Sequence, residues 1–223
     1  RTNALKSLVG KGEMGGFISM DQFWRLHSLL HERLPSIVGE VFDIGKTYKG
    51  ERIKAFFVGM HEGDEDKKDI ILFDALHHAR EFVTLSMILR IIEDQVSGLV
   101  RKSKETIDLF MSNRLLIVPV VNVDTFALIC KSFGKVDWYK TRAMRKNLNG
   151  AEIKCDSFMN SFGGVDLNRN YPLHFGKGNT AEGSSNDKCN EEYRGDKPFS
   201  EPETQAIRNV IGRYDRIVSA MNF

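Results

Sequence analysis

Neither sign of charge is in excess in this sequence, and features of several specialised protein classes are missing. Lys and Arg number 32 against 30 Asp and Glu, so the formal net charge is only +2. This balance excludes a strongly basic nucleic-acid-binding surface and a polyacidic tail, and we expect no nucleic-acid partner. The longest unbroken apolar run, Leu115 to Val121, is far shorter than the roughly 20 residues of a membrane-spanning helix. We therefore expect no membrane partner.

Cysteine is also rare, with three copies in 223 residues. Three cysteines are too few to staple a small disulfide scaffold, and they lack the C-x-x-C spacing of a metal site. What remains is an ordinary globular composition, 41% hydrophobic and 28% charged. A chain of this length can bury about 70% of its unfolded surface around one core. We therefore expect a single domain over residues 1–223.

Alternating helix and strand patterns predict an α/β fold. Ser19 and Gln22 form a capping box that starts a helix, and Gly98 is expected to stop a long, buried second helix. Apolar runs between turn residues indicate strands. Helices are therefore expected from Ser19 to Pro35, from about Arg80 to Ser97, from Lys104 to Ser112 and from Ser200 to about Arg213, and strands over 41–45, 53–58, 69–75, 115–121 and 216–223. This alternation favours a sheet flanked by helices.

A long polar region from Cys130 to Pro198 interrupts this alternation and is rich in Gly, Asn and Ser. Irregular segments of that length inside a domain are usually functional or disordered. Cys155 and Cys189 bracket a polar stretch where a disulfide would close a long loop. Cys130 follows an apolar triplet and is expected to be buried as a small hydrophobic residue.

The segment L-F-D-A-L-H-H-A-R-E, residues 72–81, carries the most distinctive local chemistry. A strand-like run ends there, and His78 and Glu81 are three residues apart where a helix should begin, so their side chains share one face. Imidazole and carboxylate are ligands that zinc takes in catalytic sites, and α/β sheets bind ligands outside the carboxyl ends of their strands. The alternative is an ordinary pair of contacting side chains on a surface helix.

Two further clusters of polar residues follow in the irregular region. One is A-M-R-K-N with Arg145, and the other is G-V-D-L-N-R-N-Y with Asp166, Asn168 and Arg169. An adjacent amide and guanidinium can hold an ionised carboxylate, because the guanidinium donates two parallel hydrogen bonds. The alternative is a solvated basic loop.

Together these segments resemble the zinc metallocarboxypeptidases of the pancreatic carboxypeptidase A/B type. H-A-R-E, M-R-K-N, G-V-D-L-N-R-N-Y and Y-R-G-D-K-P-F-S-E-P-E-T occur in that family's order and at its spacing. The resemblance covers nearly the whole chain. It implies a mixed, twisted central sheet with helices on both faces, incomplete at the C-terminus, in the N-terminal portion of a catalytic domain. It also implies a zinc-dependent exopeptidase that releases the C-terminal amino acid from peptides.

The resemblance assigns a role to each candidate residue. His78 and Glu81 would be ligands of Zn²⁺. Asp166 would orient the imidazole of His78, as metal-bound histidines generally require. The other assignments concern the substrate and the fold: Arg80 would help bind the peptide, Arg145 would stabilise the oxyanion, Asn168 and Arg169 would hold the terminal carboxylate, and Cys155 and Cys189 would form a disulfide. A disulfide points to an extracellular or secretory compartment.

One departure from the family is substantial. The family completes its zinc site with a second histidine and supplies a tyrosine and a glutamate general base, and the resemblance places all three beyond Phe223. His174 is the only histidine after His78 and the one substitute in the chain. We therefore expect little peptidase activity from these 223 residues alone. They would belong to a longer or nicked protein. The candidate partners are a separate C-terminal fragment and an N-terminal pro-segment.

Two alternative functions remain open. The first is a non-catalytic carboxypeptidase-like protein that binds peptides or matrix. The second is a relative that acts on side-chain glutamates or cell-wall peptides.

Overall fold

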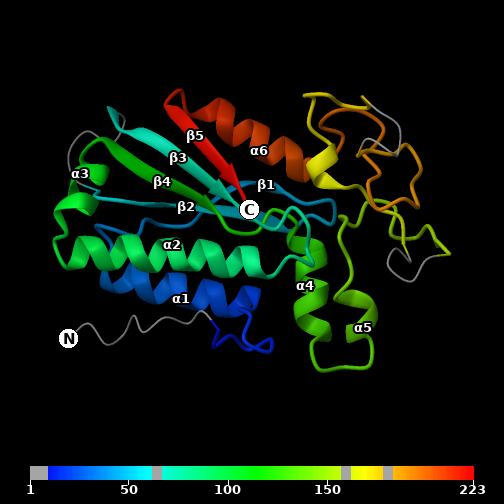
Figure 1. Cartoon of the computed structure of the whole chain (residues 1–223), viewed down its shortest axis with the longest axis horizontal. Coiled ribbons are helices and arrows are strands. Elements are labelled where there is room, and N and C mark those ends of the chain that lie inside the picture. The colour runs from blue at the N-terminus through cyan, green and yellow to red at the C-terminus, as the bar shows by residue number, and fades with distance from the viewer. Residues whose placement is uncertain (1–9, 62–66, 157–161, 178–182) are drawn as a thin grey trace.

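The computed structural model describes residues 10–61, 67–156, 162–177 and 183–223. Within them, a five-stranded sheet is surrounded by helices (Figure 1). Its strands are β1 (Phe42–Lys46), β2 (Arg52–Val58), β3 (Asp69–Asp74), β4 (Asn113–Val118) and β5 (Ile217–Asn222). The helices are α1 (Met20–Arg33), α2 (Val83–Val100), α3 (Lys104–Ser112), α4 (Val123–Ser132), α5 (Trp138–Thr141), the 3₁₀ helix η3 (Leu167–Arg169) and α6 (Pro202–Arg213).

The sheet is mixed, with the strand order β1-β2-β4-β3-β5. β2 pairs antiparallel with β1 and β4, whereas β3 pairs parallel with β4 and β5. The central strands β3 and β4 therefore end at the same edge of the sheet, where parallel α/β sheets bind ligands. The predicted strands all form, and the predicted mixed sheet is confirmed.

Helices cover both faces of the sheet, because neighbouring side chains of a strand point to opposite faces. Phe56 of β2 faces α1, with its ring centroid 6.3 Å from that of Phe23 and 4.3 Å from that of His27. The next residue, Phe57, faces the other side and contacts Tyr214 at the end of α6, with 5.6 Å between ring centroids. Figure 1 shows α1 and α2 along one face and α6 across the other.

The long helix α2 differs from its predicted bounds at both ends. It begins at Val83, after a turn that contains the candidate site, and it continues through Gly98 to Val100. Gly98 is therefore not a stop signal. A Cβ atom at this position would lie 2.2 Å from Oγ1 of Thr106 in α3, so glycine here allows two helices to approach closely.

This close approach makes a prediction about stability. We expect Gly98→Ala to destabilise the chain by about 1–3 kcal/mol, because the added methyl group overpacks the α2–α3 contact. Thr106→Ala in the same chain removes the clashing Oγ1 and should restore part of the loss, as measured by urea unfolding. Gly212→Ala in α6 is the matched control. A Cβ atom there meets nothing within 4 Å, so this variant should gain up to about 1 kcal/mol. Equal losses in the single and double variants would contradict this account.

Two predicted boundaries in the second half also need correction. Helix α6 begins at Pro202 rather than at the predicted Ser200, with Glu201 at its N-cap position and no side-chain hydrogen bond to the cap. Ser200 instead bonds to the side chain of Glu201. Helix α4 runs past Cys130, where irregular structure was predicted to begin. Cys130 is half-buried against the core, and burial raises the pKa of its thiol to about 11.

Candidate active site

The candidate site begins where the chain leaves β3 and β4. After β3 the backbone of Ala75 and Leu76 bonds to the segment that follows β4, through Val121 N to Ala75 O (3.0 Å) and Asn122 N to Leu76 O (2.9 Å). The fully buried Asn122 then donates from its amide to the carbonyl oxygens of His77 (3.2 Å) and Arg145 (3.3 Å). Asn122 therefore ties together the two loops that carry the candidate residues.

The imidazole of His78 lies between two carboxylates. Its Nε2 is 2.9 Å from Oδ1 of Asp166, and its Nδ1 is 3.1 Å from both oxygens of Glu81. Asp166 is completely buried, whereas the side chain of Glu81 is 40% exposed. One ring nitrogen is thus directed to the protein interior and the other to a carboxylate that opens to solvent.

Asp166 holds two of the candidate residues at once. Its Oδ2 accepts from Nε (3.0 Å) and Nη2 (2.8 Å) of Arg145, while Oδ1 also accepts from the backbone N–H of Asn168 (3.0 Å). Burial alone would raise the pKa of Asp166, but the hydrogen bonds and charges of His78 and Arg145 outweigh it and hold the pKa below its usual value. Asp166 is therefore ionised, and it accepts the Nε2–H of His78.

This ionisation state leaves a requirement at the outer nitrogen of His78. A neutral imidazole carries one N–H, so with Nε2–H donated to Asp166 the lone pair of Nδ1 faces the oxygens of Glu81. Two electron-pair donors at 3.1 Å require a proton or a cation between them. The donor set fits zinc, which takes imidazole nitrogen and carboxylate oxygen.

A third protein ligand is not found in the part of the chain that the structure describes. No group of three or more His, Cys, Asp or Glu side chains able to hold a metal occurs there. His174, the substitute considered from the sequence, is exposed on a turn with φ of 58°, and no hydrogen bond or ion pair joins it to His78 or Glu81 among the described contacts.

The two arginines of the site have different partners. Arg80 is held by Glu191 through two hydrogen bonds of 3.1 and 2.9 Å, and it also donates to the carbonyl oxygen of Ala143 (3.2 Å). Arg145 points from Asp166 towards Glu81, with 3.7 Å between its Nη1 and Oε1 of Glu81. The guanidinium of Arg145 therefore lies beside the His78–Glu81 pair.

The predicted carboxylate-binding pair follows Asp166 directly, in the short helix η3. Asn168 is exposed, and the half-buried Arg169 lies 3.5 Å from a carboxylate oxygen of Glu192 and also donates to the carbonyl oxygen of Gly183. Both residues are thus placed next to the buried Asp166. No described contact joins their side chains to Arg145, so the carboxylate-binding role remains a prediction.

The predicted disulfide is confirmed between Cys155 and Cys189, with 5.5 Å between their Cα atoms. The loop that contains Cys189 is also held by Lys146, whose buried ammonium group donates to the carbonyl oxygens of Lys188 (2.8 Å) and Asn190 (2.9 Å). Glu191, the partner of Arg80, follows directly. The disulfide and Lys146 therefore fix the position of Arg80 through Glu191.

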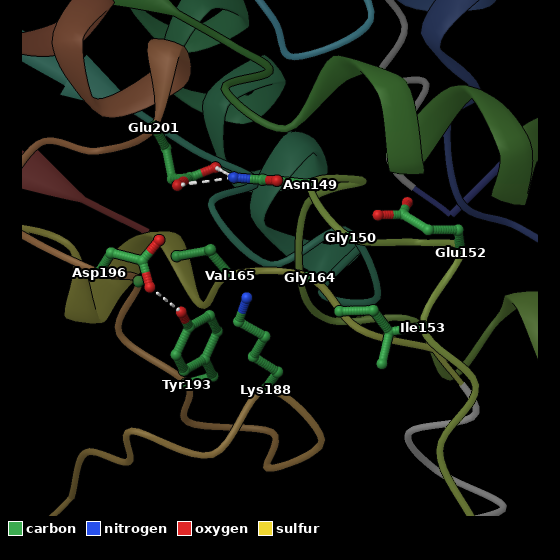
Figure 2. Close-up of a pocket in the computed structure, with 11 residues that line it drawn as sticks. Asn149, Gly150, Glu152, Ile153, Gly164, Val165, Lys188, Tyr193, Asp196 and Glu201 are labelled. Carbon is green, nitrogen blue, oxygen red and sulfur yellow. Dashed lines mark hydrogen bonds between the residues drawn. The ribbon is translucent and has the colours of Figure 1, made fainter.

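A buried polar network, which the sequence did not reveal, supports these loops. The side chain of Asn147 bonds to Glu201 (2.7 Å) and Glu203 (3.2 Å), and its backbone N–H bonds to the carbonyl oxygen of Val165, next to Asp166. The network borders a small polar cavity of about 90 Å³. Figure 2 shows Asn149 donating to Glu201 on one side of this cavity. The local signal in the sequence was the richness of this irregular region in Gly, Asn and Ser.

The network predicts a specific dependence of stability on pH. Burial raises the pKa of Glu203 from 4.5 to about 7, although Tyr48 N–H donates to it. The folded chain therefore binds more protons than the unfolded chain between these values, and stability falls as pH rises through this window. When the pH is raised from about 5 to about 8, the parent should lose more free energy of unfolding than Glu203→Gln, by up to about 3 kcal/mol. Both free energies are measured by urea unfolding.

The comparison isolates one carboxyl group. Asp74, whose pKa burial also raises to about 7, is present in both proteins, so its contribution cancels. Glu152→Gln, at an exposed position, should give a curve parallel to that of the parent. Parallel curves for Glu203→Gln as well would show that Glu203 titrates normally.

Comparison with known proteins identifies related chains. The sequence model of a family described as zinc carboxypeptidase matches residues 25–223. Carboxypeptidase B2 of Bos taurus is 29% identical over 202 residues, which cover 91% of this chain and 43% of that protein. Carboxypeptidase B of Astacus astacus is 30% identical over 178 residues, which cover 79% of this chain and 50% of that protein.

The structural comparison agrees. The crystal structure of carboxypeptidase A from Helicoverpa armigera superposes with a TM-score of 0.70 at 27% identity, covering 92% of this chain and 45% of that one. The chain thus spans about half the length of the curated relatives that it matches.

Proposed function

This chain belongs to the zinc carboxypeptidase family, and we propose that it forms part of a zinc-dependent exopeptidase that releases the C-terminal amino acid from peptides. The observation that carries the proposal is the clamped imidazole of His78, with Asp166 on one nitrogen and Glu81 on the other. We also propose that residues 1–223 are the N-terminal portion of one catalytic domain. This domain assignment rests on the family match, which extends to residue 223.

In this proposal His78 and Glu81 hold Zn²⁺, and Asp166 keeps the imidazole in the required tautomer and orientation. Zinc would polarise the scissile carbonyl group and make a bound water more acidic. Two protein donors bind zinc more weakly than the three of a typical catalytic site. A further donor from outside the described residues would complete the centre.

Each cationic side chain would bind a different part of the substrate. Arg145, beside Glu81, would stabilise negative charge that develops on the carbonyl oxygen, since fixed donors aimed at that charge lower the barrier. Arg80 would donate to the peptide backbone, and Asn168 with Arg169 would bind the terminal carboxylate. Binding of that carboxylate is what would make the protein an exopeptidase.

The partners and compartment follow from the same proposal. Peptide or protein C-termini are the substrates, and a C-terminal fragment and an N-terminal pro-segment are the further candidate partners. The disulfide between Cys155 and Cys189 favours an extracellular or secretory compartment, because disulfides persist in oxidising surroundings. None of the helices in the described ranges has the length and apolar composition to span a membrane.

The decisive experiment compares peptides that differ only at the C-terminus. The complete protein, of which these 223 residues would be a part, is loaded with zinc and incubated with a peptide that ends in a free carboxylate and with the same peptide as an amide. Release of one amino acid from the free acid, and none from the amide, is the expected result. Equal cleavage of the amide would refute the exopeptidase assignment, because no carboxylate would then be needed.

A non-catalytic protein that binds peptides is the second candidate. The two-donor centre favours it, since no third ligand occurs among the described residues. Metal analysis of the complete protein, purified without chelator, separates the candidates. Zinc at one equivalent supports the enzyme, and its absence together with retained peptide binding supports the second candidate.

A further inference from the structure

Two adjacent glutamates, in the loop that follows the disulfide, each face an arginine of the candidate site. Glu191 faces Arg80, and Glu192 faces Arg169. The loop itself is tied down by the disulfide at Cys189. In the proposed function both arginines bind substrate, yet each of them already has a carboxylate partner within the protein. The two contacts differ in how firmly they hold.

The contact between Glu191 and Arg80 is a tight, bidentate pair. Both terminal nitrogens of the guanidinium donate to the carboxylate, over 3.1 and 2.9 Å, and Nη1 also donates to the carbonyl oxygen of Ala143 (3.2 Å). These are normal N–H···O hydrogen-bond distances, and two parallel bonds are the strong form of such a pair. Glu191 therefore holds Arg80 in place.

The contact between Glu192 and Arg169 is looser. Nη2 of Arg169 lies 3.5 Å from Oε1 of Glu192, which is longer than a normal N–H···O hydrogen bond. The two side chains are 27% and 34% exposed, and ion pairs that water reaches contribute little free energy. An incoming carboxylate can therefore replace Glu192 at small cost.

The place of this contact on the guanidinium decides what it blocks. A guanidinium binds a carboxylate in bidentate fashion through one of two edges, either Nε with Nη2 or Nη1 with Nη2. In Arg169, Nε donates to the carbonyl oxygen of Gly183, which leaves the edge formed by Nη1 and Nη2. Glu192 lies against Nη2, which belongs to both edges. A substrate carboxylate can therefore form a bidentate pair with Arg169 only after Glu192 moves away.

The backbone at Glu192 is fixed, so this movement belongs to the side chain alone. The N–H of Glu192 donates to Oδ1 of Asn190 (2.8 Å), and its carbonyl oxygen accepts from the N–H of Ser185 (2.9 Å). The carbonyl oxygen of Ser185 accepts in turn from the N–H of Arg194 (3.1 Å). Rotation of the glutamate side chain is therefore enough to uncover Nη2 of Arg169, and the loop can stay closed.

We propose that Glu192 is an internal competitor of the substrate at Arg169. Its carboxylate occupies the guanidinium in the free protein and is displaced by the terminal carboxylate of a bound peptide. This inference rests on the proposed function, which gives the terminal carboxylate to Arg169, and it adds a residue that lowers the affinity for every ligand with a free C-terminus. The released amino acid carries the same carboxylate, so Glu192 also favours its departure.

Binding is tested by isothermal titration calorimetry of the complete protein, of which these 223 residues would be a part. The probe is acetyl-Gly-Leu, and its C-terminal amide is the matched ligand. EDTA in the buffer removes zinc, so that no carboxylate binds to the metal and no peptide is hydrolysed. We expect Glu192→Gln to bind the acid roughly three- to tenfold more tightly than the parent does, because the competing charge is gone. Its affinity for the amide should equal that of the parent.

Two further variants show what causes the gain. Glu192→Ala, whose side chain cannot reach Arg169, should also bind the acid more tightly than the parent does. Glu152→Gln, which removes the same charge at an exposed position on another loop, should bind it as the parent does. Unchanged affinity for the acid in both variants of Glu192 would overturn the proposal. An equal gain in Glu152→Gln would also overturn it, because loss of any nearby negative charge would then be enough.

Arg169→Gln separates this inference from the proposed function. This variant should lose the preference for the acid over the amide, and adding Glu192→Gln to it should bring no gain, because the two residues act on each other. Loss of the preference in Arg169→Gln, without any gain in Glu192→Gln alone, would refute the competitor and leave the exopeptidase in place. Tighter acid binding by Glu192→Gln, when the zinc-loaded complete protein releases no amino acid, would support the competitor and refute the exopeptidase.

Discussion

Asp166→Asn should weaken zinc binding by about 10–100-fold and destabilise the chain by about 2–4 kcal/mol. Asp166 is completely buried and accepts hydrogen bonds from both His78 and Arg145. Asparagine keeps one acceptor but removes the charge, so the half-buried guanidinium of Arg145 loses its nearest counterion and the imidazole loses the partner that fixes its tautomer. Zinc affinity is measured by competition with a chromophoric chelator, and stability by urea unfolding without metal.

Asp156→Asn is the matched control, because Asp156 is exposed and the chemical change is the same. This control should leave both measurements within experimental error. If Asp166→Asn lowers stability but leaves zinc affinity unchanged, Asp166 only supports the fold and does not orient His78.

Loss of the disulfide should cost up to about 4 kcal/mol of stability, because the bond closes a loop between residues that are far apart in the sequence and thereby restricts the unfolded chain. The test is the double variant Cys155→Ser/Cys189→Ser, compared with the parent by urea unfolding. The same variant should also free the loop that carries Glu191, and thus the guanidinium of Arg80. We therefore expect faster hydrogen exchange at 188–191, measured by mass spectrometry.

Cys130→Ser is the control for the loss of a sulfur atom. Cys130 is a free, half-buried thiol, so its replacement should change stability by no more than about 1 kcal/mol. A loss in the double variant no larger than in this control would show that the disulfide adds no stability. Unchanged exchange at 188–191 would show that Lys146 alone holds the loop.

The sequence predicted the sheet well because each strand is a local apolar run bounded by turns. Helix boundaries were less predictable where tertiary contacts override local signals. Gly98 has the sequence pattern of a helix stop, yet its function is to let Thr106 approach. Helix α4 buries Val123, Phe126 and Ile129 at helical spacing. Its periodic pattern was therefore present, but no element was predicted between the strand that ends at residue 121 and the polar region that begins at Cys130.

In the candidate site too, local sequence predicted some features, whereas contacts between distant residues determine others. Spacing alone could suggest that His78 and Glu81 share a face, and resemblance to a family supplied roles for the arginines and Asp166. Neither could supply the partner of Arg80, because Glu191 is distant in sequence and is positioned by a disulfide and by Lys146. The buried carboxylates of the Asn147 network were also beyond prediction, because an isolated glutamate pattern usually indicates a solvated surface.

The strand order has a consequence for synthesis on the ribosome. β3 pairs with β5, which emerges from the exit tunnel long after β3 itself. At a translation rate of roughly 5–20 residues per second, the backbone groups of β3 that later pair with β5 stay unpaired for on the order of ten seconds. During this interval Ile70 and Leu72, which are both buried in the finished fold, are available to a chaperone. Slow codons between the two strands would lengthen that exposure and should lower the yield of native protein.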